Sequence, residues 1–280
     1  MKLRCGGSVL SLDRAAVVGV LNVTPDSFSD GGLWLDVDAA VGHGLEMIEQ
    51  GAAIVDVGGE STRPGADPVP GEEELRRVVP VIEGLARAGV PVSIDTRKPE
   101  VAERAVAAGA TILNDTLGEE SDGALDSIAA ETGSAIFVMH SRGTPQTMRS
   151  LTDYDDVVDD VARFLRMRAR QLEAGGVAHD AIAIDPGFGF AKTANQSLEL
   201  LRRLDVFVDG GYPVLVGTSR KSFMGALLGL EVDQRSEATV ATMVWAAAKG
   251  ARILRVHEVV PTVRAVRMLE EIRGAGGAAI

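Results

Sequence analysis

Short runs of apolar, often β-branched residues alternate along the chain with longer stretches of helical periodicity. Each apolar run is continuous, which is typical of parallel strands that are buried on both faces. We expect these strands at 17–21, 54–57, 92–94, 112–113, 135–139, 182–184, 214–216 and 253–256. We expect the intervening helices at 37–50, 72–88, 99–108, 154–174, 198–206, 237–249 and 262–273.

The repeat of strand and helix predicts the fold class. Several of the helical stretches stop at a glycine, such as Gly51, Gly89 and Gly250, which is a common signal for the end of a helix. Eight strand–helix units follow one another without a Pro/Ser-rich linker or a low-complexity tract. They predict one α/β domain over residues 1–280, a single (β/α)₈ TIM barrel. A doubly wound open sheet is the alternative, and the number of units favours the barrel.

Composition and charge narrow the range of partners. The 280 residues include 28 Lys and Arg against 40 Asp and Glu, so the net charge is −12. Because such a chain repels phosphate backbones and anionic lipids, nucleic acid and a membrane surface are poor candidates. The chain has one cysteine, Cys5, no signal-peptide pattern and no apolar run near the ~20 residues of a membrane span. We therefore expect a cytoplasmic protein whose partners are small molecules.

Polar residues follow the strands, at the ends that converge on one mouth of a barrel. Active sites of this fold are built there. Taken singly, each such Asn or Asp is explained by its preference for turns. Together, however, charged and amide groups near the buried top of a barrel need hydrogen-bond or ion-pair partners. A bound ligand is the simplest such partner. The set that carries this expectation is Asp95, Asn114, Asp185, Lys221 and Arg255.

The residue types divide into two groups. Asp95, Asn114 and Asp185 suit a flat heterocycle with several N–H donors. Arg255 offers a rigid donor fork for phosphate oxygens, and a phosphate near the last two strands is a recurring feature of this fold. His257 and Asn22 belong to the adjacent eighth and first strands, and the amide oxygen of Asn22 can ligate Mg²⁺ together with substrate phosphates.

Lys221 and the first loop complete the candidate site. Lys221 is one of five lysines in an arginine-rich chain, and an ion pair or a ligand contact is its expected role, with a Schiff base as the alternative. The long loop after the first strand carries Asp26, Phe28 and Asp30 and predicts a lid over the substrate, with a plain flexible turn as the alternative. The sequence contains no P-loop, complete dinucleotide fingerprint, zinc-protease helix or nucleophile elbow.

The strand ends together resemble the dihydropteroate synthase family. The matches extend from the first strand to the eighth, so the resemblance covers nearly the whole chain. The matching segments are 22–32 (NVTPDSFSDGG), 56–65 (DVGGESTRPG), 93–96 (SIDT), 114–115 (ND), 139–145 (MHSRGTP), 185–190 (DPGFGF) with Lys192, 219–222 (SRKS) and 255–257 (RVH). The first, second and seventh of these strand ends are highly specific.

The resemblance implies a reaction. The amine of 4-aminobenzoate displaces pyrophosphate from 6-hydroxymethyl-7,8-dihydropterin diphosphate, and 7,8-dihydropteroate is formed for folate synthesis. The resemblance also implies Mg²⁺, a homodimer, and catalytic roles for Lys221, Asp95, Arg255 and His257. It assigns the pterin to Asp95, Asn114, Asp185 and Lys221; the diphosphate and Mg²⁺ to Asn22, Arg255 and His257; the aminobenzoate to Thr62, Pro64, Phe190, Lys221 and Ser222, with Arg63 and Arg220 nearby; and the closing loop to Asp26, Phe28 and Asp30.

Two other functions use a similar barrel. A methyltetrahydrofolate-binding methyltransferase needs no diphosphate site, so Arg255, His257 and Asn22 argue against it. A non-catalytic pterin-binding paralog should lack the loop residues or Lys221, and this chain has them. Glu119 and Glu258 depart from the residues common in the family, at positions that affect loop shape rather than the expected ligand contacts.

Overall fold

The computed structural model describes residues 1–24, 37–61 and 65–274, and a barrel of parallel strands forms its centre. In this part of the chain, the strand order is β8-β7-β6-β5-β4-β3-β10-β9, and an isolated parallel bridge between Ile184 and Val214 joins the two outer strands. The (β/α)₈ barrel is thereby confirmed over the doubly wound sheet. The strands are β3 (Ala16–Asn22), β4 (Ile54–Gly58), β5 (Val92–Asp95), β6 (Ile112–Asp115), β7 (Ala135–Met139), β8 (Ile182–Asp185), β9 (Leu215–Val216) and β10 (Ile253–Val256).

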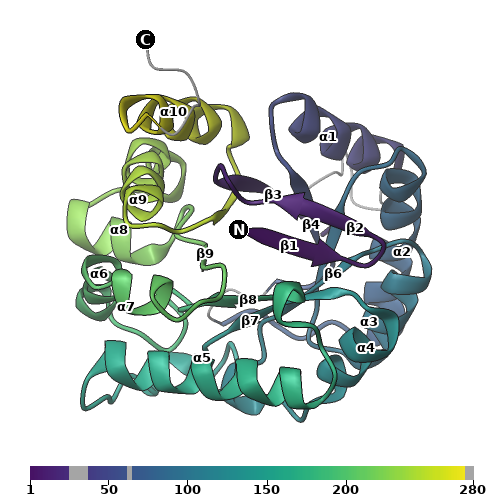
Figure 1. Cartoon of the computed structure of the whole chain (residues 1–280), viewed down its shortest axis with the longest axis horizontal. Coiled ribbons are helices and arrows are strands. Elements are labelled where there is room, and N and C mark those ends of the chain that lie inside the picture. Colours follow the sequence, from purple (N-terminus) through teal and green to yellow (C-terminus); the bar gives the residue numbers. More distant parts are fainter. Residues whose placement is uncertain (25–36, 62–64, 275–280) are drawn as a thin grey trace.

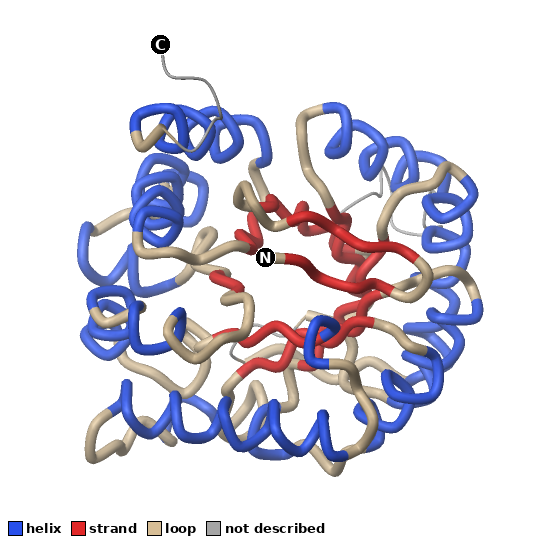
Figure 2. The backbone as a smooth tube through the Cα atoms, viewed as in Figure 1, coloured by secondary structure: helices blue, strands red, loops and turns tan. Residues whose placement is uncertain are grey.

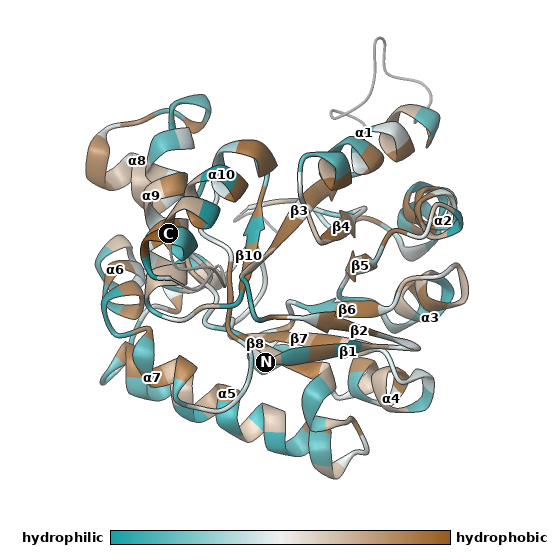
Figure 3. Ribbon diagram, turned by 45° about the horizontal axis from the view of Figure 1, so that its top comes forward, coloured by the Kyte–Doolittle hydropathy of each residue, from teal (hydrophilic) through white to brown (hydrophobic). Residues whose placement is uncertain are grey.

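Helices surround the barrel, as the ring around the strands in Figure 2 shows. The strand residues that point outward are apolar and pack against the helices; Val57, Ile94 and Leu113 are almost fully buried there. The hydropathy colouring of Figure 3 shows these apolar strands inside the ring. The helices are α1 (Val37–Glu49), α2 (Gly71–Arg87), α3 (Pro99–Ala107), α4 (Ala124–Thr132), α5 (Val157–Ala174), α6 (Ala194–Arg202), α7 (Asp205–Val208), α8 (Ser222–Leu228), α9 (Ser236–Ala248) and α10 (Val259–Ile272), with 3₁₀ turns at Gly118–Glu120, Met148–Ser150, His179–Ala181 and Val232–Gln234.

Side-chain caps explain where two helices differ from the expected bounds. The carboxylate of Asp156 accepts from the backbone N–H groups of Val158 and Asp159, so α5 begins three residues later than expected. Thr193 and Gln196 form a capping box, so α6 begins at Ala194 instead of 198. The single helix expected at 198–206 is divided between α6 and α7, and α4 and α8 are not among the helices expected from the sequence.

An antiparallel hairpin at the N-terminus closes the bottom of the barrel. Its strands are β1 (Lys2–Cys5) and β2 (Ser8–Ser11), and they lie across the centre of the ring in Figure 1. Leu3, Cys5 and Leu12 are buried against the inward-facing residues at the start of the barrel strands. Because this end is sealed with apolar side chains, the polar inward-facing residues lie toward the opposite end.

No helix in the described part of the chain is both long enough and apolar enough to span a membrane.

Candidate active site

The interior of the barrel has an apolar layer followed by a polar layer. Side chains alternate between the two faces of a strand, so positions two residues apart share the interior. On five of the strands, moving two residues along the chain replaces an apolar or small side chain by a polar one. The interior pairs are Ile54 and Asp56, Ser93 and Asp95, Ile112 and Asn114, Ala183 and Asp185, and Ile253 and Arg255.

Arg255 lies at the centre of the polar layer. Its Nε donates to Asp56 Oδ2 at 2.6 Å, and its Nη2 donates to Asp95 Oδ2 at 2.8 Å. Asn114 Nδ2 donates to the same oxygen of Asp56 at 3.1 Å. Strand pairing explains the cluster, because β5 and β6 place Asp95 directly beside Asn114. Side chains from four strand ends therefore form one cluster around this guanidinium.

Two carboxylates share this one cation. Burial raises the pKa of Asp95, Arg255 lowers it and Asp56 raises it again, and together these effects place it at about 7. Burial alone would lower the pKa of Arg255, but Asp56 and Asp95 outweigh burial and raise it. The second oxygen of Asp56, Oδ1, is buried and has no hydrogen-bond partner among the described residues. The cluster thus has acceptor capacity left for a ligand with N–H donors.

Asp185 faces the same cluster from β8. Gly187 donates its backbone N–H to Asp185 Oδ1 at 2.7 Å, which fixes the carboxylate at the mouth. Burial raises the pKa of Asp185 to about 6, although the bond from Gly187 and the nearby Lys221 and Arg255 lower it. Asp185 is therefore a second buried acceptor in the polar layer.

A strained turn directs Lys221 toward the mouth. Arg220 has φ of +57°, a left-handed conformation that is unfavourable for a residue with a side chain. Three bonds hold Arg220: its guanidinium donates to Glu258 Oε1 at 2.7 Å, its N–H donates to Thr239 Oγ1 at 3.2 Å, and its carbonyl accepts from Arg235 at 3.1 Å. The ammonium of Lys221 lies 3.9 Å from the centre of the Phe190 ring.

The neighbours of this turn account for Glu258 and for the start of α8. Glu258 accepts from both Arg220 and the Ser236 hydroxyl, so the family departure at this position has a structural role. Ser222 is the first residue of α8 and is exposed. On the adjacent strand end, the ring Nδ1 of His257 is 3.0 Å from Ser219 Oγ.

Asn22 is the last residue of β3, and it pairs with Gly58 of β4. Among the described residues, no group of three or more His, Cys, Asp or Glu side chains could hold a metal ion. The amide oxygen of Asn22 alone would be a single protein ligand. That number suits Mg²⁺, which keeps several waters and takes further oxygen ligands from substrate phosphates. The residues therefore fit a metal that is bound together with a phosphorylated substrate.

Several expected site residues lie outside the described residues: Asp26, Phe28, Asp30, Thr62, Arg63 and Pro64. Two hydrogen bonds position the residues that directly follow Pro64. The N–H of Gly65 donates to the carbonyl of Pro145 at 2.8 Å, and Gln146 donates to the carbonyl of Ala66. The loop after β4 thus contacts the loop after β7.

Asp56 is a site residue that is not among those expected from the sequence. It lies inside an apolar run, which predicts only a buried strand at this position. A signal was available, because Asp56 is the one charged residue of that run and faces the interior two residues after Ile54. A charge at an interior position of a buried strand needs a partner, and that requirement marks it as a candidate.

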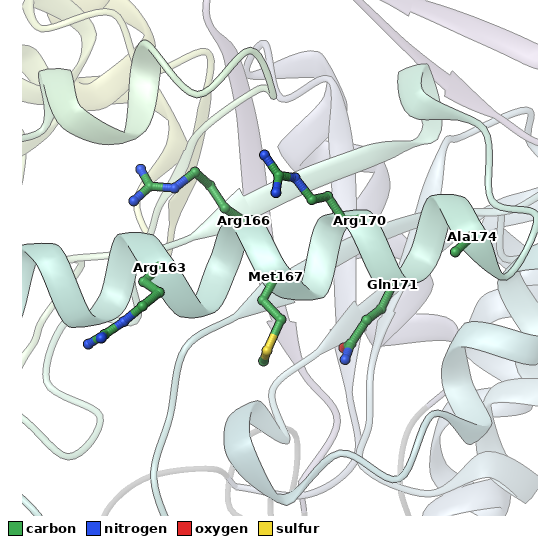
Figure 4. A pocket seen from close by; sticks show the side chains of 6 residues that line it. All are labelled: Arg163, Arg166, Met167, Arg170, Gln171 and Ala174. Carbon is green, nitrogen blue, oxygen red and sulfur yellow. The ribbon is translucent and has the colours of Figure 1, made fainter.

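Two hollows differ in their relation to the site. A surface hollow of about 430 Å³ is lined by residues of α5 alone, whose side chains project from one helix in Figure 4: Arg163, Arg166, Met167, Arg170, Gln171 and Ala174. These three arginines are exposed on one face of the helix, away from the barrel mouth. A much smaller hollow of about 10 Å³ lies at the mouth and is lined by Arg97, Thr116, Ser141, Gly143, Pro145, Met148 and Phe190.

Comparisons with known proteins agree with this site. The family described as Pterin binding enzyme matches residues 18–257. Dihydropteroate synthase of Escherichia coli (strain K12) is 47% identical over 271 residues, which are 96% of each chain. The match from the first barrel strand to His257 includes every strand end described above.

Solved structures agree as well. The dihydropteroate synthase of Xanthomonas albilineans with 4-aminobenzoic acid superposes with a TM-score of 0.90 and 47% identity, covering 97% of this chain and 98% of that one. The Yersinia pestis dihydropteroate synthase with a sulfonamide drug gives a TM-score of 0.91 and 44% identity, covering 98% and 100%. The expected resemblance is thereby confirmed, and the chain belongs to the dihydropteroate synthase family of pterin-binding enzymes.

Proposed function

We propose that this chain is a dihydropteroate synthase, a transferase of the folate pathway. It joins 6-hydroxymethyl-7,8-dihydropterin diphosphate to 4-aminobenzoate and releases 7,8-dihydropteroate and pyrophosphate. The observation that carries the proposal is the buried polar layer at the barrel mouth, where Arg255 bridges Asp56 and Asp95. Family membership and the relatives with 4-aminobenzoic acid and a sulfonamide drug support the same substrates.

The pterin ring fits the acceptor-rich part of this layer. Its ring and exocyclic nitrogens are donors, and Asp95, Asp185 and the carbonyl oxygen of Asn114 are acceptors from three strands. Asp56 joins this set through its unpartnered Oδ1. A flat donor-rich ring would thus satisfy groups whose burial is otherwise costly.

The diphosphate belongs on the opposite side, near β10 and β3. Two nitrogens of Arg255 already bind carboxylates, so its remaining Nη1 is the group left for a phosphate oxygen. His257, two residues after Arg255, offers a second hydrogen-bond donor to the diphosphate. Asn22 would hold Mg²⁺ together with the substrate, and the ion would supply charge neutralisation for the leaving pyrophosphate.

The chemistry follows from this division. Departure of pyrophosphate leaves cationic character on the methylene carbon, spread over the electron-rich pterin ring. Asp95 and Asp185 stabilise that cation, while Arg255 and His257 stabilise the departing negative charge. The arylamine attacks the methylene carbon and then loses a proton, which the released pyrophosphate accepts. No strong base is required, because the amine is already a free nucleophile near neutral pH.

The aminobenzoate would lie at the outer edge of the mouth. Phe190 and Lys221 are in contact there, and Ser222 follows at the start of α8. Thr62, Arg63 and Pro64 complete this subsite by resemblance, and Asp26, Phe28 and Asp30 supply the closing loop. Closure would exclude water, which could otherwise trap the cation.

A homodimer, one domain over residues 1–280 and a cytoplasmic location remain parts of this proposal. Exposed apolar side chains on the last three helices support self-association: Leu228 is 62% exposed, Trp245 48% and Met268 61%. Such side chains on neighbouring elements are typical of an interface between protein chains. Equilibrium sedimentation of the full chain tests this part, and a monomer at micromolar concentration would contradict it.

Pyrophosphate release tests the activity. We expect the purified chain to release pyrophosphate only when the dihydropterin diphosphate, Mg²⁺ and 4-aminobenzoate are all present. Sulfonamides should compete with 4-aminobenzoate, since they mimic it. Tight pterin binding without release would instead indicate the non-catalytic paralog.

A further inference from the structure

Lys192 is a buried lysine that the proposed chemistry does not use, and burial lowers the pKa of its amine to about 7. It follows β8 and is only 8% exposed. Its Nζ lies 2.9 Å from Nδ1 of His140, 2.9 Å from the carbonyl oxygen of Phe190 and 3.3 Å from the carbonyl oxygen of His140. An ammonium has three hydrogens, so these three acceptors use all of them. The lysine therefore ties the loop after β8 to the end of β7.

His140 is a fixed acceptor for this ammonium. Because Nδ1 accepts, the ring is neutral and carries its hydrogen on Nε2. Burial, followed by the charge of Lys192, lowers the pKa of His140 to about 4, which agrees with a neutral ring. The ring packs edge-on against Phe164 with centroids 5.0 Å apart. Both ends of the lysine contact are thus held rigidly.

The backbone at the start of the same loop touches His140 directly. Gly187 has φ of +70°, and a Cβ there would lie 1.9 Å from the His140 carbonyl oxygen. Only glycine fits at that distance, so the backbone of the loop packs closely against the carbonyl that Lys192 also binds. The two contacts bracket residues 188–191.

A strained residue separates Phe190 from Lys192. Ala191 has φ of +50°, in the left-handed region that disfavours alanine. Two donors hold the carbonyls on either side: Lys192 binds the carbonyl of Phe190, and the hydroxyl of Tyr154 donates to the carbonyl of Ala191 at 3.0 Å. The strained turn persists because these bonds hold it, and it places the Phe190 ring against Lys221.

We propose that Lys192 is a positioning residue, which holds the Phe190 ring, through the Phe190 carbonyl, at the place where Lys221 and the aminobenzoate substrate meet it. This inference rests on the proposed function. Lys192 itself contacts neither substrate in this proposal. Lys192 therefore affects the binding of 4-aminobenzoate, and it does so through the position of Phe190.

The test is a double-mutant cycle on steady-state pyrophosphate release. Lys192→Met, Phe190→Leu and the double variant are compared with wild type. We expect each single change to raise the KM for 4-aminobenzoate about tenfold, with the KM for the pterin diphosphate within about threefold of wild type. The double variant should be no more than about threefold worse than the worse single variant. Lys249→Met is the matched control, since Lys249 is a half-buried lysine that pairs with Asp205 at 3.5 Å outside the barrel mouth, and it should leave both constants unchanged.

Tyr154→Phe provides a milder second variant if Lys192→Met does not fold. It removes only the bond to the Ala191 carbonyl and should raise the KM for 4-aminobenzoate about threefold. Tyr212→Phe is its control, because Tyr212 hydrogen-bonds Glu173 away from this loop. An unchanged aminobenzoate KM in Lys192→Met, or fold-changes that multiply in the double variant, would overturn the inference while wild type stays active. In a Lys192→Met chain that fails to fold, an unchanged KM in Tyr154→Phe would overturn it. An inactive wild type would instead overturn the proposed function, and the inference with it.

Discussion

Removal of Arg255 should cost stability as well as activity, because two buried carboxylates depend on it. Asp56 is 1% exposed and Asp95 is 6% exposed, and their ion pairs with Arg255 are 2.6 and 2.8 Å long. Arg255→Met keeps an apolar stem of similar length and removes the charge. Taking one partner from a buried pair costs about 3–5 kcal/mol, so we expect a loss of that order in the free energy of unfolding at pH 8.

The pH dependence gives a sharper result. Arg255 lowers the pKa of Asp95, and without it the folded-state pKa should rise above its value of about 7. The native variant then holds a proton above pH 7 that the unfolded chain does not hold, since an unfolded Asp titrates near ~4. Its stability must fall as pH rises, by up to about 1.4 kcal/mol per pH unit for each such proton, until pH passes the folded-state pKa.

Urea unfolding followed by circular dichroism, from pH 7 to 9, measures this difference. For wild type, the slope that Asp95 contributes should fade above about pH 8, because its folded-state pKa is about 7. The variant should lose stability with a clear slope. Adding Asp56→Asn removes one of the two uncompensated carboxylates and should recover about 1–3 kcal/mol. Parallel curves for wild type and Arg255→Met, or a loss below about 1 kcal/mol, would refute this reasoning.

Three further substitutions test the pterin site, the bottom of the barrel and the loop after β8 one at a time. Asp185→Asn should raise the KM for the pterin diphosphate about 10–100-fold, because it replaces a charged acceptor by a neutral one. Steady-state kinetics measure this KM, and an unchanged value would show that Asp185 does not bind the pterin. Leu3→Ala should cost about 2–5 kcal/mol in urea unfolding by opening a cavity under the barrel, while both KM values stay the same. Gly187→Ala should abolish activity and lower the thermal midpoint, because its Cβ would lie 1.9 Å from the His140 carbonyl oxygen; an active and stable variant would show that the loop can move away.

The barrel could be predicted from sequence because burial on both faces leaves a strong local mark. Runs such as 135–139 are apolar throughout and are followed by helical stretches with glycine ends. The hairpin of β1 and β2 left no such mark, since each strand has four residues and a half-exposed pattern. Its role in sealing the barrel bottom depends on contacts with strands far along the chain. Helix α8 was missed for a similar reason, because it has only seven residues and contains a glycine.

The candidate site was predictable in its residue types and only partly in its pairing. The position of Arg255 at a strand end indicated phosphate binding. The structure adds that two of its nitrogens bind Asp56 and Asp95, which are 199 and 160 residues away in sequence. No spacing along the chain encodes that geometry, because it arises from closure of the barrel. The same holds for Lys192, whose three acceptors come from two different loops.

The most direct test of the account is the product itself. Purified full-length chain is mixed with 6-hydroxymethyl-7,8-dihydropterin diphosphate, Mg²⁺ and 4-aminobenzoate, and 7,8-dihydropteroate is quantified by mass spectrometry against released pyrophosphate. The account predicts equal amounts of the two products, and a large loss of both in Asp185→Asn. Pyrophosphate without dihydropteroate, or no turnover by a folded chain that binds the pterin, would contradict it.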